Sequence, residues 1–306
     1  MTNLAVMAFV LLSGDALAGS EVSSFKKESR LGANYWNAAS AMDGKPETCW
    51  QVDPEQKNVG SWIAIDTPAA TIDKLGMMIG WEESDDVFKD YARVKTAKVE
   101  IFETGGGEPQ LKGEGTVTFK DQRGWQVVEL PDTKVGGELL SGGRVKITVT
   151  SVYPGKDYPN LAVSEVRVQL QEFEAGTLRL NSAPASGKGE YLVDGNRSRV
   201  WVSDDLSGTF SVQAPGYGLS SLDVIQAGKA YARPKSITIR ANGAEVTHTL
   251  DDKPGIKQNV LLPYLMGYTG GSWGDIEIEV VDVYPGGQPK LAIAELALKA
   301  GSIEDI

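Results

Sequence analysis

Cysteine and histidine are almost missing from this chain, whose 306 residues include one of each, Cys49 and His248. With one cysteine, no disulfide can form within the chain. One cysteine and one histidine also fall short of a zinc site, which needs three or four protein ligands. A Ser-His-Asp or Cys-His arrangement would have to use His248, which stands between threonines in an expected strand. We therefore expect no enzyme, because paired carboxylates such as Asp85 and Asp86 are ordinarily solvated when they lie in loops.

Basic side chains are in the minority: 30 lysines and arginines stand against 41 aspartates and glutamates, a formal net charge of −11. The field of the whole molecule repels polyanions, so we expect neither nucleic acid nor an anionic lipid surface as a partner. Long apolar runs are missing after the first residues, so we also expect no membrane insertion.

The first residues carry one short apolar run, from Leu4 to Leu12. It is too short to span a bilayer as a helix, and it is followed by Ala16-Leu17-Ala18, a small-x-small pattern that signal peptidase accepts. We therefore expect residues 1–18 to be a secretory signal peptide. The alternative is a short buried N-terminal segment. Export without disulfides favours a bacterial protein that is periplasmic or secreted.

Strand patterns dominate the rest of the chain. In "RVKITV", Val145, Ile147 and Val149 alternate with polar residues, and "DIEIEV" repeats the pattern from Asp275. Such alternation predicts half-buried antiparallel strands. The 35 glycines exceed the usual share of roughly 7 % and indicate many tight turns. The pattern predicts an all-β fold.

An internal repeat divides the chain in two. Four motifs recur in the same order: Asp43-Gly44 as Asp194-Gly195, "YARVK" at Tyr91 as "YARPK" at Tyr231, "SVYPG" at Ser151 as "DVYPG" at Asp282, and "LAVSEV" at Leu161 as "LAIAEL" at Leu291. Ordered recurrence of this kind is the signature of duplicated structural units. We therefore expect two domains, residues 19–172 and 173–306, with the joint near residues 171–177.

These motifs carry a family resemblance. "DG" followed by "T-x-W", then "GSWIAID" and "VSEVRV", resembles the discoidin or coagulation-factor-type C (F5/8 type C) domain. The segments "MIGWEESDDVFKDYARVKTAKVEIF" and "ITVTSVYPGKDYPNLAVSEVRV" are similar to the glycan-binding variant of that domain found beside a bacterial NAD glycohydrolase toxin. The resemblance covers residues 34–170 and, more loosely, the second copy, and it does not extend to the glycohydrolase. It implies two tandem β-sandwich jelly rolls of the galactose-binding-like kind.

The resemblance also implies a structural calcium ion at the Asp-Gly turn. Carried over to this sequence, its ligands would be Asp43, the carbonyl of Lys45, Thr48 and Glu165. Calcium takes six to eight oxygens, which a tight turn can supply from carbonyls and carboxylates together. The alternative is that Asp43 only caps the turn and Glu165 is a solvated strand residue.

The second copy differs at this turn because Arg199 stands where the first has Thr48, while Asp194 and Glu295 remain. A guanidinium between two carboxylates could replace a bound cation and satisfy both. We therefore expect calcium in the first copy only. The alternative is that Arg199 points into water.

Aromatic side chains in polar loops are the candidate ligand contacts. Sugar sites pair an aromatic face with polar groups that bond hydroxyls. The candidates are Tyr35, Trp36, Trp81, Lys89, Arg93 and Tyr158. Each could instead be a core or rim residue, and for Arg93, which recurs as Arg233, that is the stronger interpretation. Trp36, Trp81 and Tyr158 have no counterpart in the second copy and are the better candidates.

These observations predict an exported, non-catalytic carbohydrate-binding protein that acts on a glycan or glycoconjugate at a cell surface or envelope, chiefly through its first copy. The rival hypothesis is a protein-protein or envelope-scaffold module with the same fold and no affinity for sugar. Exposure of Trp36, Trp81 and Tyr158 around one concavity would favour sugar binding, and their burial would favour the scaffold. The sequence leaves the glycan and the oligomeric state open.

Overall fold

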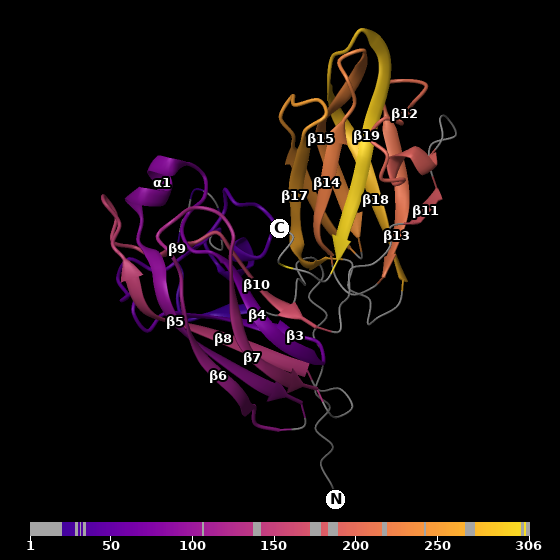
Figure 1. The fold of residues 1–306 in the computed structure, drawn as a ribbon. Helices are drawn as coiled ribbons and strands as arrows, with labels where there is room; N and C mark the ends of the chain where they lie inside the picture. Colours follow the sequence, from indigo (N-terminus) through magenta and orange to yellow (C-terminus); the bar gives the residue numbers. More distant parts are fainter. Residues whose placement is uncertain are drawn as a thin grey trace, which may run out of the picture.

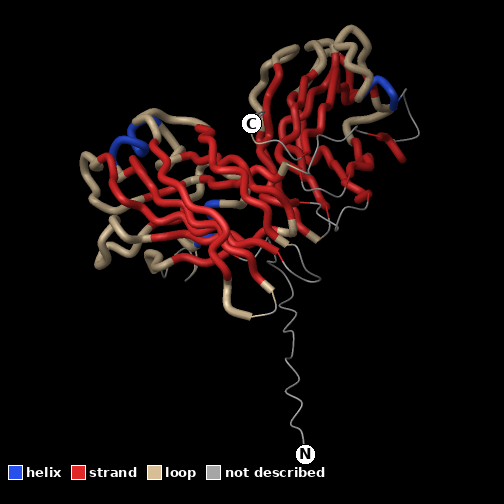
Figure 2. Tube along the Cα trace, turned by 60° about the horizontal axis from the view of Figure 1, so that its bottom comes forward, coloured by secondary structure: helices blue, strands red, loops and turns tan. Residues whose placement is uncertain are grey.

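The computed structural model describes residues 20–27, 30, 32, 35–105, 107–136, 142–171, 179–182, 189–215, 219–241, 243–266, 273–300 and 303. The expected signal peptide lies outside these residues. The described chain is mainly strand, with short helical pieces (Figure 2): α1 (Asp85–Asp90) and the 3-10 helices η1 (Ala38–Ala41) and η2 (Gly189–Leu192). No helix within this part of the chain has the length and apolar character to cross a membrane.

The N-terminal half, residues 20–171, forms two facing sheets. The first has the order β1-β3-β8-β5-β6, the second has the order β10-β4-β7, and β2 pairs with β9 beside them. The strands are β1 (Ser20–Val22), β2 (Trp50–Gln51), β3 (Trp62–Thr67), β4 (Ala70–Met78), β5 (Arg93–Thr104), β6 (Gln110–Thr118), β7 (Gln126–Val135), β8 (Gly142–Tyr153), β9 (Ala162–Val163) and β10 (Glu165–Leu170).

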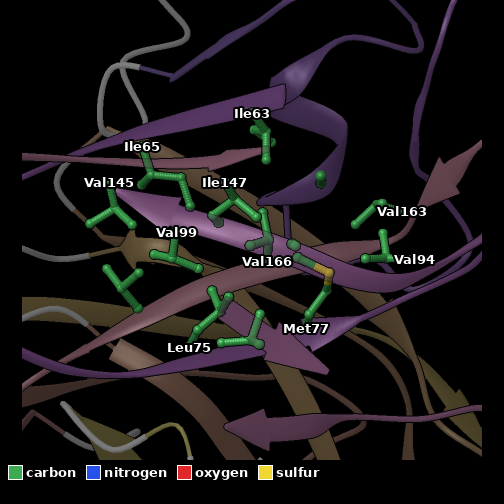
Figure 3. Close-up of a cluster of buried hydrophobic side chains, with 14 of the residues drawn as sticks. Ile63, Ile65, Leu75, Met77, Val94, Val99, Val145, Ile147, Val163 and Val166 are labelled. Carbon is green, nitrogen blue, oxygen red and sulfur yellow. The ribbon is translucent and has the colours of Figure 1, made fainter. Parts of the chain in front are cut away.

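The alternation in the sequence places the core between these sheets. On β8, Val145, Ile147 and Val149 are buried, because successive side chains of a strand point to opposite faces. Figure 3 shows valines and isoleucines of the larger sheet facing Leu75 and Met77 of the smaller one. Burial of each such side chain stabilises the fold by about 1.5–3 kcal/mol.

The C-terminal half, residues 179–303, repeats this arrangement of strands. One layer runs β11-β13-β18-β15-β16 and the other β19-β14-β17 with β12 beside β19, and the parallel pairing of β15 with β19 joins them. The strands are β11 (Arg179–Ser182), β12 (Trp201–Val202), β13 (Gly208–Pro215), β14 (Leu219–Gln226), β15 (Tyr231–Ala241), β16 (Ala244–Thr249), β17 (Lys257–Met266), β18 (Trp273–Tyr284) and β19 (Gln288–Ala300).

Each half has its own core. One buried cluster draws on residues 38–170 and the other on residues 192–298, and Figure 1 shows the two bodies of strand in indigo to magenta and in orange to yellow. One residue crosses over: Tyr264 of β17 is buried in the N-terminal cluster. The predicted all-β sandwich fold is confirmed. The domain boundaries and the duplication stay predictions.

Candidate functional site

The Asp43–Thr48 turn, which we call the first corner, gathers oxygen atoms around one hydroxyl. Thr48 Oγ1 lies 2.9 and 2.8 Å from the two carboxylate oxygens of Asp43, 2.8 Å from the Lys45 carbonyl and 3.2 Å from the Ser40 carbonyl. Gly44 makes the turn possible because its φ of 78° lies in the left-handed region that glycine tolerates. One hydroxyl can donate to only one of these acceptors. Backbone N–H groups supply two more donors, from Lys45 to Asp43 Oδ1 (2.9 Å) and from Thr48 to the Lys45 carbonyl (2.9 Å), so four acceptor oxygens share three protons at the first corner.

Glu165 closes the first corner from below. Its Oε1 accepts hydrogen bonds from the backbone N–H groups of Gly44 (2.6 Å) and Lys45 (3.1 Å), and its Oε2 pairs with Arg167 at 3.3 Å. Burial raises the pKa of Glu165 to about 8, and burial likewise raises that of Asp43 to about 6. The Asp43 carboxylate further raises the pKa of Glu165, and the Glu47 carboxylate further raises that of Asp43, so a cation placed here would lower both pKa values.

The oxygens at the first corner fit a hard cation in part. Asp43, Thr48 and the Lys45 carbonyl come together as a calcium site requires, and the Ser40 carbonyl joins them. Glu165 differs, because both of its oxygens already accept hydrogen bonds. No three His, Cys, Asp or Glu side chains cluster in the described part of the chain, so a cation here would depend on hydroxyl and carbonyl oxygens.

The corresponding turn of the C-terminal half, the second corner, corrects one expectation. Arg199 donates to Asp194 at 3.4 Å and lies over the Tyr191 ring, but it does not reach Glu295. Glu295 Oε1 accepts from the Gly195 N–H (3.2 Å), and its buried Oε2 has no hydrogen-bond partner. The prediction that Arg199 satisfies both carboxylates is therefore wrong for Glu295. The Arg199 guanidinium instead lies 5.6 Å from the centroid of the Tyr191 ring, in cation–π range, and its side chain is 56 % exposed.

Five aromatic rings form a continuous row at the loop end of the N-terminal half. Neighbouring ring centroids are 4.6, 5.2, 5.1 and 4.7 Å apart. This aromatic row consists, in order, of Tyr35, Trp36, Trp81, Tyr91 and Tyr158. The first three contacts are edge-to-face and the last is stacked, both favourable geometries for aromatic pairs.

The row is exposed at its ends and covered in its middle. Tyr158 is 50 % exposed and Tyr35 is 37 % exposed, while Trp81 is half-buried. Trp36 is only 5 % exposed and packs with Cys49. The structure thus brings Trp36, Trp81 and Tyr158 together, as the sugar hypothesis requires, but gives Trp36 the burial expected of a core residue.

Helix α1 and the loop after β8 hold the exposed end of the row. Ser84 caps the helix by accepting from the Val87 N–H (3.2 Å), and the last helical carbonyl, that of Asp90, accepts from the N–H groups of Asp157 (3.2 Å) and Tyr158 (2.8 Å). The loop is thereby tied to the helix, and Tyr158 is laid flat on Tyr91.

The two charged candidates have different positions. Arg93 is buried and makes a two-pronged ion pair with Asp121 (2.7 and 3.0 Å), and it also donates to the carbonyls of Tyr91 (2.8 Å) and Lys89 (3.3 Å). The structure thus gives Arg93 a scaffold position instead of a ligand-facing one, as its recurrence at Arg233 indicates. The Lys89 side chain is exposed at the last turn of α1.

Tyr91 is not among the residues that the sequence indicates as ligand contacts, and its motif recurs at Tyr231. Its ring in fact carries the exposed Tyr158. Lys26 is a second residue that the sequence does not indicate: its ammonium lies 5.4 Å from the centroid of the Trp36 ring, in cation–π range. No local pattern marks Lys26, because its partner lies on another loop.

Comparison with known proteins identifies the family of the N-terminal half. Residues 13–169 match the model of the NAD glycohydrolase translocation F5/8 type C domain. No curated protein sequence matches the chain. Among solved structures, the chain is similar to arabinofuranosyltransferase AftD from Mycobacteria, with 13 % identity and a TM-score of 0.34 over 92 % of this chain. It spans only 29 % of the length of that enzyme.

Two further similar structures are smaller. One is the pair of CBM32 domains from ZmpB of Clostridium perfringens in complex with GalNAc, at 11 % identity and a TM-score of 0.32, covering 92 % of this chain and 89 % of that chain. The other is the F5/8 type C domain of a Bacteroides fragilis protein, at 13 % identity and a TM-score of 0.36, covering 51 % and 92 %. The family match takes in both the first corner and the aromatic row, and the chain therefore belongs to the NAD glycohydrolase translocation F5/8 type C domain family.

Proposed function

We propose that this protein is a non-catalytic, exported carbohydrate-binding protein whose binding surface is the exposed end of the aromatic row. The observation that carries the proposal is the stacked pair of Tyr91 and Tyr158, with centroids 4.7 Å apart and Tyr158 half exposed. An exposed ring lying flat offers the apolar face that a pyranose packs against. Rings that are held in place before binding lose little conformational entropy when the sugar arrives.

Polar groups surround this ring pair as a sugar site needs. The Lys89 side chain is exposed on α1, and Lys156 lies 3.5 Å from Asp157 and 3.9 Å from Asp90. Burial and the neighbouring Asp157 carboxylate raise the pKa of Asp90. Carboxylates and ammonium groups next to an aromatic face can accept from and donate to sugar hydroxyls. The proposed action outside the cell draws its support from the match to a family described as an NAD glycohydrolase translocation domain.

The binding proposal is tested by screening the purified full-length chain on a glycan array and titrating the selected glycan by calorimetry. We expect one weak site per chain, because a shallow aromatic surface covers little of a hydrated sugar. Trp81→Ala should abolish the heat while circular dichroism stays native-like. If the folded protein binds no glycan on the array, the scaffold function is favoured, which the burial of Trp36 also supports.

We further propose that the first corner binds a calcium ion through Asp43, Thr48 and the carbonyls of Lys45 and Ser40, with Glu165 holding the turn from beneath. Bound calcium would neutralise the buried carboxylates and fix the turn. A ligand that binds only the folded state, present at a concentration ten times its dissociation constant, raises the free energy of unfolding by about 1.4 kcal/mol. Calcium should therefore raise the melting temperature of the chelated full-length protein. Asp43→Asn should remove that rise, and Asp194→Asn at the second corner should not.

A further inference from the structure

Strand β17 of the C-terminal half covers the first corner and leaves the second corner open. A Cβ atom added to Gly44 would stand 2.7 Å from the Leu262 carbonyl carbon and 2.9 Å from the Leu261 carbonyl oxygen. A Cβ atom added to Gly195 would meet nothing within 4 Å. The two glycines have similar backbone angles, with φ of 78° and 71°. They therefore differ in their surroundings and not in their conformation.

A buried arginine stabilises the same contact between the two halves. Arg167 of β10 is 1 % exposed and donates to the Ser220 carbonyl of β14 at 3.0 Å and to the Leu262 carbonyl of β17. A buried guanidinium is costly unless its N–H groups are paired. Two of the three acceptors of Arg167 lie in the C-terminal half, so docking pairs both of its terminal nitrogens, while its buried Nε has no hydrogen-bond partner.

Further contacts cross between the halves on either side of Arg167. Tyr264 of β17 donates from its backbone N–H to the Met42 carbonyl (2.9 Å) and from its hydroxyl to the Val168 carbonyl (3.3 Å). The Trp125 indole donates to the Ile303 carbonyl at 2.7 Å. The contact between the halves thus includes one buried ring, that of Tyr264, and directed hydrogen bonds.

The first corner also contacts the aromatic row, through residues other than Gly44. The Glu47 carbonyl accepts from the Trp81 indole (2.8 Å), and the Pro46 carbonyl accepts from Ser164 Oγ (2.6 Å). Ser164 Oγ in turn accepts from the Glu82 N–H (3.0 Å), the residue after Trp81. The six-residue turn therefore contacts β17 through Gly44 and Trp81 through the Glu47 carbonyl.

We propose that the C-terminal half is a positioning element for the binding surface of the N-terminal half: by holding the first corner, β17 sets the orientation of Trp81 and, through it, of Tyr91 and Tyr158. If docking of the halves positions these rings, docking and glycan affinity are linked. This consequence rests on the proposed function. The described part of the aromatic row contains no residue of the C-terminal half, so the effect passes through the corner.

The test uses full-length Gly44→Ala with Gly195→Ala as its matched control. Both substitutions place a side chain at a positive φ, but only Gly44→Ala collides with β17. Two indole signals in ¹H–¹⁵N spectra, assigned with Trp81→Phe and Trp125→Phe, report separately: Trp125 on docking and Trp81 on the binding surface. We expect both signals to move in Gly44→Ala and neither to move in Gly195→Ala.

A second pair of variants separates loss of docking from local distortion of the turn. Tyr264→Ala removes a ring that lies between the halves, and Tyr284→Ala removes one whose hydroxyl donates to the Leu250 carbonyl within the C-terminal half. Tyr264→Ala should move both indole signals and weaken glycan binding at least about fivefold, the low end of usual coupling between sites. Tyr284→Ala should leave both indole signals and glycan binding unchanged.

The proposal is overturned if the Trp125 signal moves while the Trp81 signal and glycan affinity stay as in the wild type. It is also overturned if docking persists in both Gly44→Ala and Tyr264→Ala, because β17 would then not be what holds the corner. Failure of the wild type to bind any glycan would refute the proposed function instead, and the two indole signals would still decide whether the C-terminal half positions Trp81.

Discussion

The pKa values of the carboxyl groups at the first corner are set by burial more than by ion pairs. Glu165 has an arginine and two backbone N–H donors as partners, yet desolvation outweighs them and raises its pKa to about 8. A sequence shows the glutamate but not what covers it, so the alternative that Glu165 is solvated could be rejected only from the structure.

The raised pKa of Glu165 makes stability depend on pH in a definite direction. Its ordinary pKa is 4.5 and its folded value is about 8, so within this window the folded state binds more protons than the unfolded state. In chelator, the free energy of unfolding should therefore fall as pH rises from about 4.5 to about 8. Denaturant titrations across this range check the slope.

Glu165→Gln is the variant that isolates this group. The amide keeps an oxygen for the Gly44 N–H but cannot ionise, so its slope over the same pH range should be shallower than that of the wild type. Glu129→Gln, at an exposed position on β7, should leave the slope unchanged. A wild-type stability that rises with pH through the window would show that Arg167 and the backbone donors outweigh burial.

At the scale of elements, strands were predictable and contacts between loops were not. "RVKITV" and "DIEIEV" lie in β8 and β18 as expected, because a period of two is a local property of the chain. The aromatic row joins four loop and strand segments that are distant in sequence, so the sequence predicts only some of its residues. Trp36 was expected in a polar loop, but the packing of Cys49 and Ala162 buries it.

Helix α1 is the short element on which the binding surface depends. Ser84→Ala removes its N-cap and should cost about 1 kcal/mol. The helix would fray, and the Asp90 carbonyl that holds the Tyr158 loop would lose its fixed position. We expect faster amide exchange at Val87 and Tyr158, and glycan affinity lower by a few fold. Ser207→Ala, at an exposed serine of the C-terminal half, should change neither; equal effects from both variants would contradict the role given to α1.

At the scale of the whole molecule, the two halves share their strand order but differ in their corners. The first corner is closed by β17 and adjoins the aromatic row, and the second is open with an arginine directed outward. The repeated motifs predicted the common fold. They could not predict the docking, because both copies carry the same Asp-Gly pair with a positive φ at its glycine, and only Gly44 has β17 beside it.

The most direct measurement compares Tyr158→Ala with Tyr158→Phe in calorimetric titrations of the full-length chain with the glycan that the array selects. Phenylalanine keeps the ring stacked on Tyr91, and alanine removes it. Stacking of an aromatic pair adds about 0.5–1.5 kcal/mol beyond its buried area, and the sugar loses its platform as well. The account predicts that Tyr158→Phe binds within a few fold of the wild type and that Tyr158→Ala shows no measurable heat. Wild-type affinity in Tyr158→Ala would contradict it.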